Sequence, residues 1–265
     1  MQGEFSRGHS LSVVLPAFNE EPNIGPMIEG CLEFLPEVAD EFEVIVVDDG
    51  SHDGTAEVAQ QWVDRSHPTV RLLIHDRNLG YGAAIRTGLQ HAGKELVFYT
   101  DADRQFDVRE LTYFLPMIAD YDLVIGFRVY RYDAAFRSVV SWGYNWLVAV
   151  LFRVRVRDVD CAFKLMRAEV RDKLPLQTDD FFIDTEIVAS ARRWNFRIAE
   201  KGVRHYPRVA GETTVAAGDV IRTLRTIARM WRRIYRPSRV QRIEAEEIGG
   251  RIVATERSPA SADAR

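Results

Sequence analysis

The sequence predicts an α/β fold built on a twisted, mostly parallel central sheet that is flanked by helices. Short, mostly apolar segments alternate with segments of helical periodicity from Leu11 to Gly126. Three of the apolar segments end in acidic or amide side chains, and a parallel sheet brings such ends to one edge. The chain of 265 residues is 46% hydrophobic and 28% charged, which suits one large domain with short appendages.

Five strands are expected in the first half of the chain, each a short apolar or β-branched run: Leu11–Pro16, Phe42–Val47, Val70–Ile74, Leu96–Thr100 and Leu123–Gly126. Helices are expected in the connections, where apolar residues recur at helical spacing: Pro22–Phe34, a segment opened by Asp53-Gly-Thr55, a segment from Gly82 to Ala92, and Val108–Ala119. This alternation is typical of right-handed crossover connections between parallel strands.

The regular alternation of short strands and helices ends after Gly126. Longer elements are expected beyond it: a helix at Val139–Phe152, a strand at Asp158–Met166, a helix at Phe182–Trp194, a strand within Phe196–Val203 and a helix at Asp219–Arg236. The last of these carries arginines around an apolar face. We expect a flexible segment at residues 1–10, one folded domain at 11–215, an amphipathic basic helix at 216–237, and a polar tail at 238–265 that is at least partly disordered.

Composition narrows the possible partners and the compartment. The net charge of −4 and the pI near 5.9 give no case for nucleic-acid binding. Cys31 and Cys161 are far apart and lack metal-ligand spacing, so buried thiols in a reducing, cytoplasmic setting are expected. The first ten residues lack the apolar core of a signal peptide. No apolar run approaches the roughly 20 residues that span a bilayer.

Two carboxylates, Asp101 and Asp103, directly follow the strand Leu96–Thr100. Gln105 continues the pattern of a polar side chain at every second position. Carboxylate and amide oxygens suit Mg²⁺ or Mn²⁺ held together with phosphate oxygens of a ligand. The alternative is an Asp-rich turn that caps a helix beginning near Asp107.

Further acids, Glu20, Asp48 and Asp49, follow the first two strands. Asp48 and Asp49 can accept a hydrogen bond from a ribose hydroxyl or a base N–H, or they can form an Asx-type turn around Gly50. Phosphates lying directly against so many acids would be repelled, and a divalent cation removes that conflict.

The glycine-rich segment from Gly80 to Ile85 resembles the start of a dinucleotide-binding fingerprint, but Ile85 stands where the third glycine or alanine belongs. It also follows the third strand rather than the first. A tight turn that leads into a helix is the preferred interpretation.

The motifs occur in a family-specific order: Pro16-Ala-Phe-Asn-Glu20, Val47-Asp-Asp-Gly-Ser51, Asn78-x-Gly80, Asp101-Ala-Asp103-x-Gln105 and Gly126-x-Arg128. This order resembles the inverting family 2 glycosyltransferases with a GT-A fold, and more narrowly the dolichyl- or polyprenyl-phosphate mannose or glucose synthases. Later segments extend the resemblance to about Thr214: Arg137-x-x-x-Ser141, Asp158 to Lys164, Phe182-x-Asp184-x-Glu186 and Arg208-x-x-Gly211-x-Thr213.

The resemblance implies a role for each matching residue. The nucleotide sugar would be bound by Pro16, Phe18, Glu20, Asp48, Asp49, Asp101, Ala102, Arg128 and Arg208. Mg²⁺ or Mn²⁺ would be held by Asp101, Asp103 and Gln105, and the acceptor phosphate by Arg137, Ser141 and Arg208. The catalytic set would be Asp103, Arg128, Asp184 and Glu186. The chain departs from the family pattern at Ala162, where glycine is usual, at Arg104, where leucine is usual, and at Thr213-Thr214, which replaces a serine-lysine pair.

The implied reaction is inverting transfer of mannose or glucose from a GDP- or UDP-sugar to a polyprenyl or dolichyl phosphate. Two alternatives stay open: a transferase acting on a soluble or glycan hydroxyl, with Asp184 or Glu186 as general base, and a nucleotide-sugar-binding module without turnover. A lipid acceptor implies peripheral contact with the cytoplasmic face of a membrane through Val139–Phe152 and Asp219–Arg236. The same apolar faces could instead pack on the domain or on a second subunit in a homo-oligomer.

Overall fold

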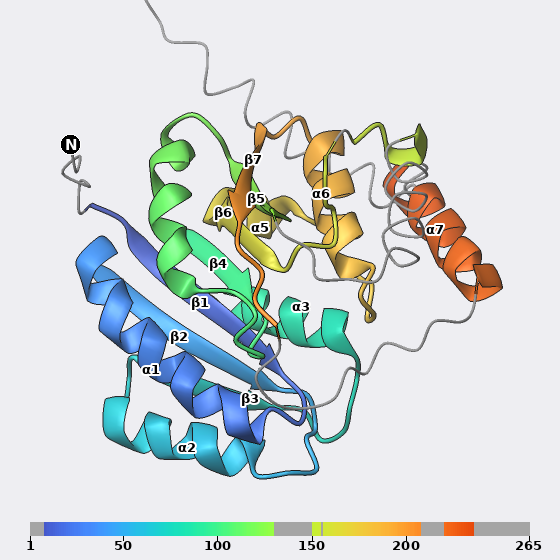
Figure 1. Cartoon of the computed structure of the whole chain (residues 1–265). Helices are drawn as coiled ribbons and strands as arrows, with labels where there is room; N and C mark the ends of the chain where they lie inside the picture. Colours follow the sequence, from blue (N-terminus) through green and yellow to red (C-terminus); the bar gives the residue numbers. More distant parts are fainter. Residues whose placement is uncertain (1–7, 130–149, 155, 208–219, 236–265) are drawn as a thin grey trace, which may run out of the picture. The chain divides into compact units, whose positions relative to one another are not determined.

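The computed structural model of the protein describes residues 8–129, 150–154, 156–207 and 220–235 (Figure 1). The chain divides into two units, Met1–Ala217 and Gly218–Arg265. The expected helix Val139–Phe152 lies mostly outside the described residues, as do the polar tail and most of the N-terminal segment. The first unit contains the whole sheet and is described first.

The sheet has seven strands in the order β3-β2-β1-β4-β6-β5-β7. The strands are β1 Ser10–Ala17, β2 Glu41–Asp48, β3 Val70–Ile74, β4 Leu96–Thr100, β5 Leu123–Arg128, β6 Phe163–Arg167 and β7 Ile198–Val203. β6 pairs antiparallel with β4 and β5, and the other paired strands run parallel. The predicted α/β fold with a mostly parallel sheet is therefore confirmed.

Helices fill the connections between the strands: α1 Glu21–Val38, α2 Thr55–Ser66, α3 Tyr81–His91, α5 Ala168–Lys173 and α6 Ile183–Arg193. Two short 3₁₀ helices, η1 Val108–Tyr113 and η2 Leu115–Ala119, stand where one α-helix was predicted. Pro116 explains this difference, because it has no N–H to continue an α-helical ladder from the preceding turn.

The predicted strand Asp158–Met166 is also shorter than expected and begins only at Phe163. The Asp158 carboxylate instead accepts hydrogen bonds from Arg128, and the Cys161 amide bonds to the Asp158 carbonyl. These contacts hold residues 158–161 in a turn at the edge of the sheet.

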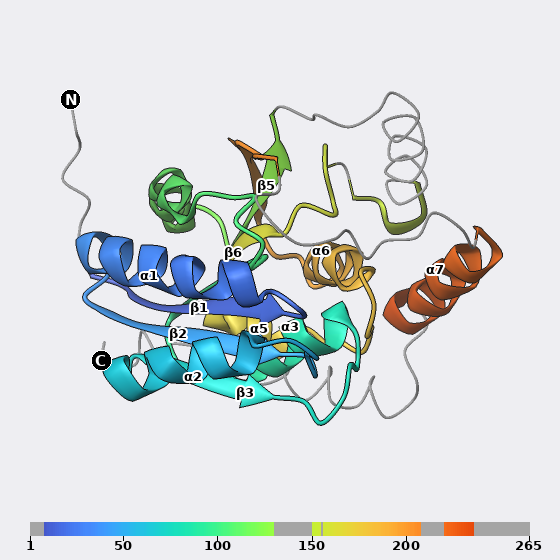
Figure 2. The same ribbon diagram turned by 60° about the horizontal axis from the view of Figure 1, so that its bottom comes forward.

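The alternation of side chains along β1 determines which helix covers which face of the sheet. Val13 and Leu15 belong to the large hydrophobic cluster that includes Ile24 and Ile28 of α1. Val14 points the other way, toward α3, where a Cβ added at Gly88 would collide with its side chain. Helix α1 and helix α3 therefore pack on opposite faces of β1 (Figure 2).

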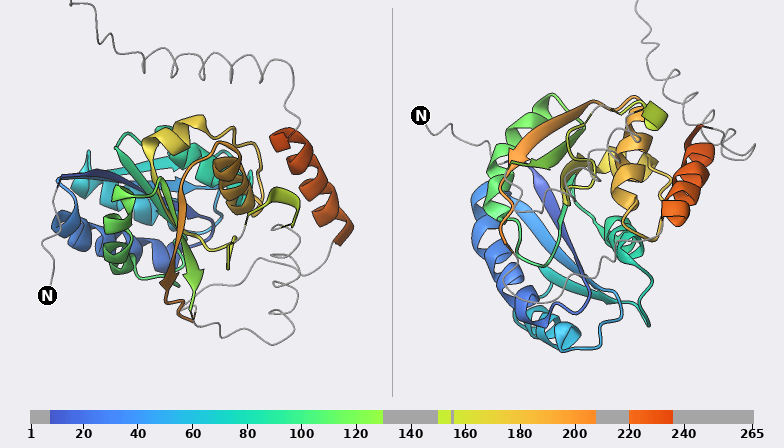
Figure 3. Two further views of the ribbon diagram at one scale, coloured as in Figure 1. Left: turned by 90° about the horizontal axis from the view of Figure 1, so that it is seen from above. Right: turned by 45° about the vertical axis from the view of Figure 1, so that its right-hand side comes forward.

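The N-terminus of α3 packs directly against the segment that precedes α6 (Figure 3). The amides of Gly82 and Ala83 donate to the Asp179 carbonyl at 2.8 and 3.3 Å. Gly80 has a φ of 106° and, like Gly82, lies so close to this segment that a Cβ would collide with it. The glycines thus allow a close backbone approach, and a protein carbonyl occupies the helix terminus that would bind phosphate in a dinucleotide site.

The second unit contains helix α7, Val220–Tyr235. Ile227, Met230 and Ile234 recur at helical spacing, and the rings of Trp231 and Tyr235 lie 5.8 Å apart. Within the described part of the chain, no helix is both long enough and apolar enough to cross a membrane.

We expect Gly82→Ala to destabilise the fold by about 1–3 kcal/mol, because the added methyl group would lie within 3.0 Å of the Thr178 and Asp180 carbonyl oxygens. Gly30→Ala in α1 is the matched control. Nothing lies within 4 Å of the place that its added methyl group would occupy, so we expect a gain of about 0.5–1 kcal/mol from helix propensity. Chemical denaturation of both variants measures the difference. Equal stabilities would contradict the described packing of α3 on the 178–180 segment.

Candidate active site

The acids that follow β1, β2 and β4 lie at one edge of the sheet, the edge formed by the carboxyl ends of these strands. Ala17 pairs with Asp48, and Val14 pairs with Tyr99, so β1 lies between the acid-bearing ends of β2 and β4. Neighbouring strands are about 4.8 Å apart, which separates the β2 and β4 ends by roughly 10 Å.

The loop after β1 is bound to the loop after β2. The Asn19 amide donates to Ser51 Oγ at 2.9 Å, and the Glu20 amide donates to Thr55 Oγ1 at 2.8 Å. The Phe18 ring meets the His52 ring edge-on, with centroids 6.1 Å apart. Pro16 is the next-to-last residue of β1 and pairs with Val47. The Glu20 carboxylate is largely buried and accepts from Asn23 Nδ2 at 2.7 Å, so it supports the start of α1.

Asp48 and Asp49 are both buried at the end of β2, and they differ in their partners. Asp48 Oδ1 accepts hydrogen bonds from the Ser51 amide and hydroxyl, which forms the predicted turn around Gly50. Burial raises the pKa of the Asp48 carboxyl, and the bonds from Ser51 oppose that shift. Asp49 instead reaches the Leu79–Gly80 turn before α3 and accepts from its amides at 2.9 and 2.8 Å.

The segment after β4 holds Asp101 and Asp103 close together. The Gln105 amide donates to Asp103 Oδ1 at 3.0 Å, which closes a turn in which Arg104 adopts a φ of 62°. The Gln105 side-chain amide donates to the Tyr206 carbonyl at 3.0 Å. Ala102 between the two acids is buried.

The chemistry of these side chains fits a divalent cation. Burial, together with the charge of Asp103, raises the pKa of Asp101 to about 8. The buried Tyr81 hydroxyl faces Asp101 without a well-formed hydrogen bond. Within the described residues, no cluster of three or more His, Cys, Asp or Glu side chains is placed to hold a metal ion. A cation here would therefore have to complete its coordination with Gln105 and with oxygens of a bound ligand.

A buried charge network lies beside Asp101, and the sequence pattern alone did not reveal it. Lys164 of β6 is fully buried and its Nζ contacts Asp184 Oδ1 and the Cys161 carbonyl. The Tyr99 hydroxyl donates to the same Asp184 oxygen at 2.6 Å. One feature of the sequence could have indicated this network: a single lysine, Lys164, stands within the apolar run Phe163–Met166. A charge buried in a strand needs a partner.

Asp160 lies near this network, with Oδ1 at 3.5 Å from Thr185 Oγ1 of α6. Burial raises the pKa of its carboxyl to about 7, and the neighbouring charge of Asp184 adds to the shift.

Arg128 of β5 forms a bidentate ion pair with Asp158. The Nε–Oδ2 distance is 2.7 Å and the Nη2–Oδ1 distance is 2.8 Å. Hydrogen bonding to Asp158 raises the pKa of Arg128 above its usual value despite the opposing effect of burial. Glu186 is fully buried, and its carboxylate accepts from the amides of Gln177 and Thr178. Arg137, Ser141 and Arg208 lie outside the described residues.

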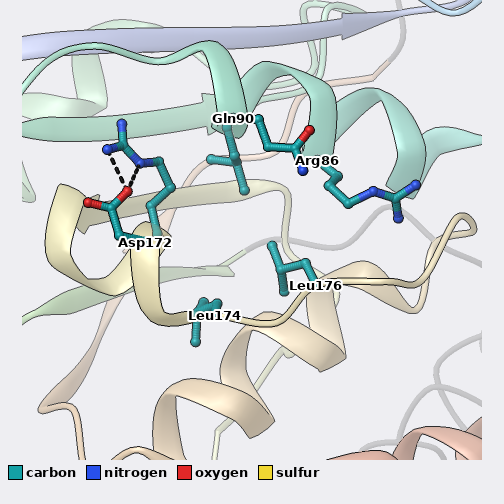
Figure 4. Close-up of a pocket in the computed structure, with 7 residues that line it drawn as sticks. Arg86, Gln90, Asp172, Leu174 and Leu176 are labelled. Carbon is teal, nitrogen blue, oxygen red and sulfur yellow. Dashed lines mark hydrogen bonds and ion pairs between the residues drawn. The ribbon is translucent and has the colours of Figure 1, made fainter. Parts of the chain in front are cut away.

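A separate hollow of about 290 Å³ lies between α3 and α5. Arg86 and Gln90 of α3 line it from one side, and Asp172, Leu174 and Leu176 line it from the other (Figure 4). None of the predicted site residues lines this hollow. Its two arginines, Arg86 and Arg171, are paired with Asp179 and Asp172, so we assign it no role.

The protein is thus an α/β protein with acids gathered at the carboxyl edge of its sheet. The family model of glycosyl transferase family 2 matches residues 12–182, and the chain belongs to this family. It is 31% identical over 220 residues to the dodecaprenyl-phosphate galacturonate synthase of Rhizobium johnstonii, covering 82% of this chain and 64% of that protein. It is 33% identical over 224 residues to the dolichyl-phosphate beta-glucosyltransferase of Drosophila melanogaster, covering 76% of this chain and 68% of that protein. The predicted resemblance is therefore confirmed, and the chain spans just under two thirds of the Rhizobium synthase.

Solved structures share the fold. The glucosyl-3-phosphoglycerate synthase of Mycobacterium tuberculosis, solved with Mn²⁺, UDP and glucosyl-3-phosphoglycerate, gives a TM-score of 0.59 at 20% identity, with 86% of this chain and 77% of that chain covered. A mannosyltransferase of Pyrobaculum calidifontis, solved with GDP-mannose and Mn²⁺, gives a TM-score of 0.57 at 22% identity, with 78% of this chain and 59% of that chain covered. The GT-A architecture implied by the sequence motifs is confirmed by these two neighbours.

Proposed function

We propose that this protein transfers a hexose, mannose or glucose, from a GDP- or UDP-sugar to a polyprenyl phosphate with inversion at the anomeric carbon. The observation that carries the proposal is that acids from β2 and β4 lie on either side of β1 at one edge of the sheet. Two relatives named as polyprenyl- or dolichyl-phosphate sugar transferases support the lipid acceptor.

On the donor side, we assign the nucleoside to Pro16, Phe18, Glu20, Asp48 and Asp49. Asp101, Asp103 and Gln105 would hold Mg²⁺ or Mn²⁺, beside Ala102. When bound, the cation neutralises negative charge that develops on the leaving nucleoside diphosphate. Two structural neighbours solved with Mn²⁺ support the choice of a divalent ion.

On the acceptor side, we assign phosphate binding to Arg137, Ser141 and Arg208, with Arg128 placed at the donor phosphates and oriented by Asp158. Arginine suits this task because its planar guanidinium makes paired bonds to phosphate oxygens. Glu186 would support the site by holding the 177–178 loop, since its buried carboxylate binds backbone amides.

The hydrogen-bond partners of Asp184 favour a phosphate acceptor over a hydroxyl acceptor. Its Oδ1 already accepts from Tyr99 and Lys164, so this oxygen is poorly placed to take a proton from an incoming alcohol. A phosphate oxygen is anionic near neutral pH and needs no strong base. In the hydroxyl-acceptor alternative, the general base would be Asp184 after all or the neighbouring Asp160, whose pKa burial raises to about 7.

Asp103→Ala is expected to abolish sugar transfer, because it removes one of the two carboxylates that would hold the cation. Asp107→Ala is the matched control: its carboxylate caps η1, at the Arg109 amide, in the same segment of chain, and we expect activity within about twofold of wild type.

The assay for both variants supplies radiolabelled nucleotide sugar with a lipid extract and then partitions the products between solvents. Label in the organic phase supports the proposed function, label in soluble glycan supports a hydroxyl acceptor, and binding without transfer supports a non-catalytic module. Full activity of Asp103→Ala would refute the metal assignment.

Asp184→Asn is expected to lower stability by about 3–5 kcal/mol, since it leaves the charge of Lys164 buried without its partner. The double variant Lys164→Met/Asp184→Asn removes both charges, and we expect it to recover most of that stability. If the acceptor is a phosphate, the double variant also recovers part of the transfer activity.

Thermal unfolding and the partition assay on the same preparations separate these effects. A double variant that is stable yet inactive would instead identify Asp184 as a general base and favour a hydroxyl acceptor.

We also propose that α7 lies on the cytoplasmic surface of an anionic membrane, where Trp231 and Tyr235 suit the headgroup level and arginines attract anionic lipid. Replacing Arg229 and Arg232 with glutamine is expected to weaken vesicle binding roughly fivefold per arginine. Flotation with phosphatidylcholine vesicles, with and without phosphatidylglycerol, measures this, and a chain lacking residues 219–236 should not float.

Arg192→Gln with Arg193→Gln is the matched control, because it removes the same charge from exposed positions on α6. Unchanged flotation of the α7 variants would favour packing of this helix on the domain or on a second subunit.

A further inference from the structure

We infer that His75 is a positioning residue for the nucleotide-binding carboxylate of Asp49 and fixes the direction in which that carboxylate meets the donor. This inference rests on the proposed function, in which Asp49 contacts the base or ribose. His75 belongs to none of the motifs discussed above, and it directly follows the last residue of β3.

The His75 ring is held at both nitrogens. Nδ1 lies 2.7 Å from Asp49 Oδ1, and Nε2 lies 2.9 Å from Thr87 Oγ1 in the middle of α3. The backbone of the residue is also fixed, because its amide donates to the Asp48 carbonyl at 2.9 Å. The side chains of His75 and Asp49 are only 10% and 4% exposed, so the contact is largely removed from water.

These partners define which nitrogen carries the proton in the neutral ring. A carboxylate oxygen only accepts, so Nδ1 is the donor to Asp49. Nε2 then accepts from the Thr87 hydroxyl, which can donate or accept. The carboxylate of Asp49 therefore fixes the tautomer, and Thr87 of α3 holds the ring from its opposite side.

An inventory of acceptor sites shows what remains for a ligand. A carboxylate offers about four lone-pair positions. On Asp49, Oδ1 takes His75 Nδ1 and the Leu79 amide, and Oδ2 takes the Gly80 amide. Counting the contacts made by the described residues, one position is left on Oδ2, and a single base N–H or ribose hydroxyl would fill it.

The two loop amides alone do not fix this direction. Both come from the Leu79–Gly80 turn, so they hold the carboxylate from the α3 side of the site. His75 adds a contact from the end of β3. Without it, the carboxylate is anchored only to that turn and moves with it, so the remaining acceptor position no longer points to one place. The predicted cost therefore appears in donor binding rather than in the chemical step.

The test uses two amide side chains, each of which can replace one of the two imidazole nitrogens. In His75→Asn, the side-chain NH₂ can take the place of Nδ1–H, whereas in His75→Gln it reaches toward the position of Nε2. His75→Leu removes both contacts. His91→Leu is the matched control, because His91 is an exposed α3 histidine whose Nδ1 bonds only to the Thr87 carbonyl.

Binding of UDP and of GDP with Mn²⁺ is measured by calorimetry on the full chain, and kcat and KM are measured with the matching nucleotide sugar. We expect His75→Leu and His75→Gln to raise the nucleotide Kd and the donor KM about tenfold with kcat within about twofold. His75→Asn should restore binding to within about twofold of wild type, and His91→Leu should bind as wild type does.

Wild-type affinity in His75→Leu would overturn the inference, and so would an asparagine variant that binds as weakly as the leucine variant. A loss of kcat and of thermal stability at unchanged Kd would also overturn it, by showing a purely structural role. Wild-type protein that binds neither nucleotide would instead overturn the proposed function. Wild-type protein that transfers sugar, with unchanged binding in His75→Leu, would overturn the role of His75 alone.

Discussion

The site depends on one electrostatic constraint: several carboxylates are crowded into the partly buried carboxyl edge of the sheet, where each needs a compensating partner. Asp184 has Lys164, Asp158 has Arg128, and Asp49 has two backbone amides and His75. Asp101 differs, because its close neighbour is a second acid and its pKa is raised to about 8. In the proposed function, the cation would bind beside these two acids.

Close backbone approach joins the two halves of the sequence at this edge. Glycines at the start of α3 let the 178–180 segment lie against the helix, and that segment leads into α6 with Asp184. β6 inserts antiparallel between β4 and β5, which carries Lys164 from the second half of the chain to the strand that ends in Asp101. Asp101 and the Lys164–Asp184 pair are therefore parts of one packed structure.

The paired state of Asp184 bears on the choice between acceptors within the family. A transferase that uses a lipid phosphate needs an oriented, electrically balanced surface more than a strong base. Lys164, Tyr99 and Asp184 provide such a balanced group next to the acids of β4. Asp160 is the nearby carboxyl with a pKa of about 7, and it is where a change of acceptor chemistry would first be sought.

The sequence by itself determined the alternation of strands and helices, the acids that follow three strands, and the family. These features are local, because periodicity, strand ends and motif order are written in contiguous residues. Tertiary structure alone decided the antiparallel insertion of β6, the two 3₁₀ helices in place of one α-helix, and the partners of Lys164 and His75. Lys164 and Asp184 are 20 positions apart, and His75 and Asp49 are 26 apart. Such pairs are selected by how the elements pack, which no local pattern encodes.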